Sequence, residues 1–135
     1  MTLEDLRERF VIDDEVRSER LEGLIQKALP HCVVHKNGGV EVKGVRLSGR
    51  QLVKLVLVAR FLASKLEGDI ACDVTVEQIA EYTGLPKSQA AARAKECLDE
   101  RFAERSSRGS YKARLLKIDE FLDQLAQVEK SGRTS

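Results

Sequence analysis

The sequence predicts a mainly helical fold with a small β component, in the α+β class. In several stretches, apolar residues recur at spacings of three and four. Three of these open on Thr or Ser with Asp or Gln three residues later, which is the capping-box signature of a helix start. In addition, two pairs of short extended runs each surround a turn that contains glycine, as in β-hairpins.

Composition limits the kinds of protein this chain can be. It has 135 residues, of which 42% are hydrophobic and 33% are charged, which suits one compact domain with an extension. No apolar run approaches the roughly 18 residues that a membrane-spanning helix needs. The first ten residues, MTLEDLRERF, are acidic and amphipathic, unlike a signal peptide. We therefore expect a cytoplasmic protein with no membrane partner.

The cysteines predict neither disulfides nor a cofactor. Cys32, Cys72 and Cys97 are widely spaced and odd in number, which fits reduced thiols. The alternative is a zinc site in which His31, Cys32 and His35 join one of the other cysteines. This local spacing matches no paired-ligand pattern, and lone cysteines usually serve as small buried apolar residues. We expect no metal and no cofactor.

Residues 1–47 are predicted to form an N-terminal extension of two helices and a β-hairpin. The hairpin is predicted because Asn37-Gly38-Gly39, which accept the positive φ of a tight turn, separate two extended runs. The expected elements are a short helix opened by the capping box of Thr2 and Asp5, a helix from Asp13 or Asp14 to Pro30, and strands at 32–36 and 40–45.

A long helix and a pair of short ones follow. Ser48 with Gln51 opens a helix whose apolar stripe is so wide that we expect it at the centre of the fold, ending at Gly68. A capping box at Thr75 opens a shorter helix that Gly84 closes. A proline then begins the next helix, predicted at 86–100. Two helices joined by so short a turn have the geometry of a helix-turn-helix.

The helix at 86–100 and the segment after it concentrate positive charge. In this helix Ala90 or Ala91, Ala94, Cys97 and Leu98 are spaced to face the core, whereas Lys87, Ser88, Gln89, Arg93 and Glu96 fall on the other side. The next segment predicts a hairpin at 102–116, with strands at 102–105 and 111–116 around a Ser-Ser-Arg-Gly-Ser turn.

Residues 48–117 resemble a winged helix-turn-helix domain of the kind found in small prokaryotic, especially archaeal, transcriptional regulators. The residues that carry the resemblance are the helix from Ser48, the stretch TVEQIAEYTGLPKSQAAARAKECL and the basic hairpin ERSSRGSYKAR. The resemblance implies that helix 86–100 lies in the DNA major groove and that the hairpin is a wing on the backbone or minor groove. The candidate DNA-binding residues are Lys87, Ser88, Gln89 and Arg93 in the helix and Arg105, Arg108, Lys112 and Arg114 in the wing.

The sequence departs from the family's pattern at two places. Ala90-Ala91-Ala92 put methyl groups where many relatives carry polar side chains that contact bases, which weakens the expectation of tight sequence specificity. Alanine methyls can still contact thymine methyls. The turn before Phe102 also lacks the glycine that usually follows the second helix.

The C-terminal segment predicts an amphipathic helix at 118–130 followed by a flexible tail at 131–135. Either this helix or the N-terminal one can pair two copies into a homodimer, which would present two recognition helices to DNA. We find no P-loop, dinucleotide-binding glycine pattern or nucleophile elbow. We therefore expect a non-enzymatic, double-stranded DNA-binding transcriptional regulator. The alternatives are a protein-interaction module in a transcription or replication assembly, and a nucleic-acid-processing enzyme or its subunit.

Overall fold

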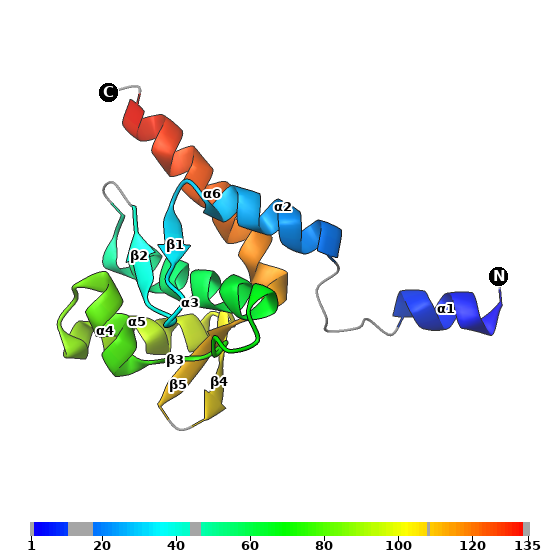
Figure 1. Cartoon of the computed structure of the whole chain (residues 1–135), viewed down its shortest axis with the longest axis horizontal. Coiled ribbons are helices and arrows are strands. Elements are labelled where there is room, and N and C mark those ends of the chain that lie inside the picture. The colour runs from blue at the N-terminus through cyan, green and yellow to red at the C-terminus, as the bar shows by residue number, and fades with distance from the viewer. Residues whose placement is uncertain (1, 11–17, 44–46, 108, 134–135) are drawn as a thin grey trace.

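The computed structural model describes residues 2–10, 18–43, 47–107 and 109–133 (Figure 1). They form a mainly helical fold with small antiparallel sheets, as the sequence predicts. No helix in these ranges is both long enough and apolar enough to cross a membrane. The elements are α1 (Leu3–Phe10), α2 (Ser18–Ala28), β1 (Cys32–Val34), β2 (Val40–Val42), α3 (Gly49–Leu66), β3 (Val74–Thr75), α4 (Val76–Thr83), α5 (Lys87–Asp99), β4 (Ala103–Ser107), β5 (Ser110–Ala113) and α6 (Leu115–Arg133).

Helix α3 is the centre of the fold. Its predicted capping box is present, since the amide of Gln51 donates to Ser48 Oγ at 3.2 Å and the amide of Ser48 donates to Gln51 Oε1 at 2.9 Å. Every residue from Leu55 to Leu62 is buried, and α3 packs against α2, α4, α5, β5 and both strands of the first hairpin. The expected central position is confirmed. The helix ends at Leu66, slightly before the predicted end at Gly68.

Two small sheets flank α3. β1 and β2 form the predicted hairpin, although both strands are shorter than expected and residues 44–46 lie outside the described part of the chain. The second sheet has the order β3-β5-β4, all antiparallel. β3 was not predicted. It is a two-residue strand that pairs Val74 with Tyr111 and Thr75 with Ser110.

The junction between hairpin and C-terminal helix differs from the prediction. The strand expected at 111–116 ends at Ala113, and the helix expected at 118–130 already begins at Leu115. The physical reason is helical spacing, because half-buried Leu115 lies three residues before buried Ile118 and continues the face of α6 that packs on the core. The helix also extends to Arg133, past its expected end at residue 130.

The boundaries of three other predicted elements also shift. Helix α2 runs from Ser18 to Ala28, and its expected start at Asp13 or Asp14 lies outside the described residues. Pro86, expected in the first turn of the helix at 86–100, is instead the N-cap of α5, with φ −56° and ψ 146°. The strand expected at 102–105 is observed from Ala103 to Ser107. None of these shifts changes the order of the elements.

Candidate functional site

The turn between α4 and α5 is held by local contacts. Gly84 adopts a left-handed conformation with φ 78°, and its amide donates to the carbonyl of Ala80 at 2.9 Å. The next amide, that of Leu85, donates to Thr83 Oγ1 at 3.2 Å. The side chain of Leu85 lies over Gly49, where an added Cβ would be 3.5 Å from Leu85 Cδ1. The turn therefore fixes α5 against both α4 and the start of α3.

Helix α5 turns one polar face outward. Ala90, Ala94 and Cys97 are fully buried, as the spacing predicted. Of the three consecutive alanines, only Ala92 is exposed, so the methyl surface on the outer face is smaller than the sequence suggested. Lys95, which is not among the DNA-binding residues predicted from the sequence, is exposed and lies one turn beyond Ala92 on this face. The exposed residues on α5 include Lys87, Ser88, Gln89, Ala92, Lys95 and Asp99.

The C-terminal end of α5 is closed without glycine. Arg101 takes the left-handed conformation, with φ 62°. Its amide donates to the carbonyl of Leu98 at 3.0 Å, and the amide of Phe102 donates to the carbonyl of Cys97 at 2.9 Å. These two bonds form a Schellman motif with arginine at the position that glycine usually occupies. The departure seen in the sequence is therefore accommodated by a strained Arg101.

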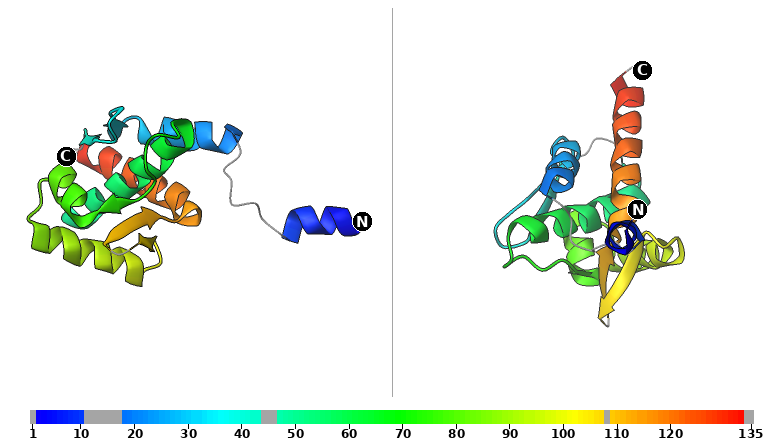
Figure 2. Two further views of the ribbon diagram at one scale, coloured as in Figure 1. Left: turned by 60° about the horizontal axis from the view of Figure 1, so that its bottom comes forward. Right: turned by 90° about the vertical axis from the view of Figure 1, so that its right-hand side faces the viewer.

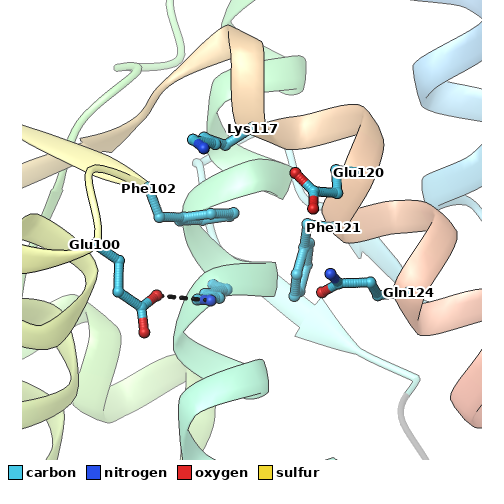
Figure 3. A pocket seen from close by; sticks show the side chains of 7 residues that line it. Glu100, Phe102, Lys117, Glu120, Phe121 and Gln124 are labelled. Atoms are coloured by element: carbon cyan, nitrogen blue, oxygen red, sulfur yellow. Dashed lines mark ion pairs between the residues drawn. The ribbon is translucent and has the colours of Figure 1, made fainter.

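A charged and aromatic cluster holds this end of α5 in place (Figure 3). Lys54 Nζ lies 2.9 Å from Glu100 Oε2 and 4.9 Å from the centre of the Phe102 ring. Phe102 in turn makes an edge-to-face contact with Phe121 of α6, with ring centres 5.4 Å apart. Burial is the main cause that lowers the pKa of Lys54, and the nearby charge of Arg50 lowers it further. The cavity here is only about 140 Å³, and we interpret the cluster as a brace between α3, α5 and α6.

The hairpin β4–β5 follows directly. Arg105 is exposed, with its guanidinium 5.8 Å from the centre of the Tyr111 ring, and it pairs with Tyr111 across the strands. Lys112 makes an ion pair with Glu104 at 3.3 Å. Arg114, expected within the second strand of the wing, is exposed and lies between β5 and α6. Arg108 lies outside the described residues.

Two of the candidate cations on α5 have carboxylate partners. Lys87 Nζ lies 2.9 Å from Glu77 Oε1 of α4, and this hydrogen bond lowers the pKa of Glu77. Arg93 pairs with Glu96 at 2.6 Å along the same helix. The side chains of both pairs are between 39% and 67% exposed, and ion pairs this exposed are weak. These cations therefore remain available to another anion.

The two hairpins lie on opposite sides of the molecule. The left view of Figure 2 shows α5 and β4–β5 along one side and β1–β2 on the other, with α3 between them. The structure thus brings α5 and the hairpin β4–β5, which carries Arg105 and Lys112, to a common side. Lys36 lies in the turn of the first hairpin and Lys43 directly after β2, and both are exposed.

The alternative zinc site gains no geometric support. Among the described residues, no three His, Cys, Asp or Glu side chains lie close enough together to hold a metal ion. His31 and Cys32 are buried, whereas His35 is exposed. Burial raises the pKa of Cys32 and that of Cys97 to about 11 in each case, which keeps both thiols protonated and poor as ligands.

No protein-family model, curated protein or solved structure matches this chain. The function must therefore be inferred from the chain's own geometry.

Proposed function

We propose that the chain binds double-stranded DNA as a winged helix-turn-helix protein, with α5 in the major groove and β4–β5 as the wing. The observation that carries this proposal is the exposed polar face of α5 together with the hairpin β4–β5 on the same side of the molecule, which carries the exposed Arg105. The order of elements supports it. Two helices joined by a tight turn, α4 and α5, are followed at once by an antiparallel hairpin, and β3 completes the sheet.

The outer face of α5 suits close approach to a duplex. Ser88 and Ala92 are small, so the helix backbone can sit deep in a groove that admits an α-helix. Gln89 can make paired hydrogen bonds to an adenine edge, and Lys95 can contact guanine or phosphate. Few side chains on this face can distinguish bases. We therefore expect modest sequence specificity and binding that depends mainly on phosphate contacts, as in a transcriptional regulator with low intrinsic selectivity.

The wing supplies charge near the end of α5. Arg105 has no ion-pair partner among the described residues, and Lys112 is held only by the exposed Glu104. A phosphate can replace such a partner at little cost, because exposed pairs contribute at most about 1 kcal/mol. Each phosphate that a cation neutralises releases counterions, which makes the affinity fall with salt.

The salt dependence of duplex binding tests this proposal. We expect Lys95→Ala with Arg105→Ala to weaken binding and to reduce the slope of log K against log salt by roughly 2, since each lost phosphate contact removes about 0.9. The matched control is Lys36→Ala with Lys43→Ala, which removes two exposed cations from the first hairpin and its end. Fluorescence anisotropy with a labelled duplex between 50 and 200 mM salt measures both slopes.

If both double variants change the slope equally, or neither does, α5 and the wing do not contact DNA. That outcome would favour the second candidate function, a protein-interaction module. The observation that favours it is the mixture of charges on this side, where Glu77, Glu96 and Glu104 accompany the cations. Such a surface suits a protein partner that carries both charges.

A further inference from the structure

A shallow hollow of about 510 Å³ lies on the outer side of α6, next to the start of α2. Leu116 is the one apolar residue among the described residues of its wall and is 71% exposed. Around it lie carboxylates of α6, including Glu120 and Asp123, and Arg20 of α2. Lys27 already pairs with Asp123 at 3.0 Å, whereas Glu120 has no ion-pair partner among the described residues. The hollow thus combines an exposed leucine with a carboxylate that interacts with Lys54 only at longer range.

Helix α1 carries an exposed apolar face with a positive charge at its border. Leu3, Leu6 and Phe10 follow one another at spacings of three and four, and they are 86%, 46% and 90% exposed. Arg7 lies beside this stripe, whereas Glu4 lies farther round the helix. The capping box of Thr2 and Asp5 is formed, with both hydrogen bonds at 3.2 Å, so the helix start is stabilised locally. The helix therefore presents an apolar stripe with a cation at its border, and the described chain leaves it uncovered.

We propose that α1 of one copy of this chain binds the α2–α6 hollow of a second copy, and that the exchange is reciprocal. The two surfaces match in both polarity and charge. The apolar Leu3 and Phe10 can cover Leu116, and the positive Arg7 can pair with the negative Glu120. The proposal does not rest on DNA binding. It assigns α1 as the arm of a homodimer and the outer side of α6 as its receptor.

A second copy is a better occupant than the chain's own α1. In the structure α1 stands apart from the other helices (Figures 1 and 2), and its stripe is exposed. The seven residues 11–17 can span up to about 23–25 Å, so α1 can extend well beyond the body of its own chain. Reciprocal exchange forms the same contact twice and also brings the two bodies together, as closed two-fold dimers do.

Disulfide trapping between different chains tests the exchange directly. In a Cys72→Ser background, one chain carries Leu6→Cys and a second, size-tagged chain carries Gln124→Cys, a residue that lines the hollow. We expect the mixed disulfide between the two chains to form on mild oxidation. The control replaces Leu6→Cys by Glu4→Cys, which lies away from the stripe, and should give little of it. A single chain that carries both cysteines and closes only on itself would show that α1 binds its own body, and would overturn the proposal.

Dimer mass provides a second, independent readout. We expect light scattering of the wild-type chain to show a dimer, and Leu3→Ser with Phe10→Ser to weaken dimerisation by at least about tenfold. These side chains are exposed, so the variant should keep its helical circular dichroism. Arg7→Glu should weaken the dimer, and adding Glu120→Arg should restore it. A wild-type chain that remains monomeric at all concentrations, or a double charge reversal that restores nothing, would refute the proposal.

Discussion

Replacing Arg101 by glycine should stabilise the protein. Arg101 is the one described non-glycine residue with a positive φ, 62°, and its side chain is exposed. The left-handed conformation costs an L-residue about 1–2 kcal/mol, whereas glycine adopts it freely. Glycine also makes the unfolded chain more flexible, which lowers the free energy of unfolding by about 0.5–1 kcal/mol and offsets part of the relieved strain. The two backbone hydrogen bonds of the Schellman motif do not depend on the side chain. We therefore expect a net gain of about 0.5–1 kcal/mol in the free energy of unfolding.

Urea unfolding followed by circular dichroism measures this gain. With a slope of about 2 kcal/mol per molar urea, in the middle of the typical range, the midpoint of Arg101→Gly should rise by roughly 0.3–0.5 M. Arg101→Ala is the control, because it removes the same charge but keeps a Cβ and therefore the strain. If the midpoint of Arg101→Gly stays level or falls while the slope is unchanged, Arg101 does not strain the folded protein. If Arg101→Ala stabilises the protein equally, the gain comes from removing the charge and not from relieving the left-handed conformation.

Three further outcomes follow from buried or strained positions. Leu122→Ala, at a site that is 1% exposed, should lower the free energy of unfolding by about 2–5 kcal/mol in urea titrations, and a loss below 1 kcal/mol would mean that α6 is loosely packed. Gly38→Ala should cost about 1–2 kcal/mol in the same assay, since φ there is 91° and the new Cβ would lie 2.8 Å from Arg60 Nη2; no loss would indicate that the turn can rearrange. Because its pKa is raised to about 11, the Cys97 thiol is almost fully protonated at pH 8 and should react with a thiol reagent only after unfolding. Half-exposed Cys72 should react in the folded protein and is the control. Rapid labelling of Cys97 at pH 8 would show that α5 opens readily.

Features fixed by a few neighbouring residues were predictable from sequence. The capping boxes at Ser48 and Thr75 are local hydrogen-bond patterns, and both form as expected. Gly84 also takes the left-handed conformation expected of a helix stop. The buried face of α5 follows from spacing alone. These contacts depend on residues at most a few positions apart, so the sequence contains all that is needed to predict them.

Features that depend on distant partners were missed. β3 has only two residues and exists because β5, more than thirty residues later, pairs with it. Leu115 and Leu116 fit a strand as well as a helix until α6 is seen to pack on the core. Arg60 was not singled out from the sequence, yet it is 4% exposed beneath the turn at Gly38 and donates to the carbonyl of Asp73 at 3.4 Å.

The candidate site was predictable in part. The sequence placed Ser88 and Gln89 on the outer side of α5, where they are indeed exposed. Lys95 was overlooked although its spacing of seven from Ser88 marks the same face. The partners of Lys87 and Lys112, which lower the free charge of the surface, lie on other elements and could be identified only from the structure.

The position of β5 ties two distant parts of the molecule together. This strand lies between β3 and β4, and a single residue, Arg114, separates it from α6. Because this connection is so short, a change in the tilt of the β4–β5 hairpin would also move the first turn of α6, where Leu116 is exposed. Inserting two glycines after Arg114 would uncouple the hairpin from α6. A molecule that binds the hairpin would then no longer affect the position of the first turn of α6.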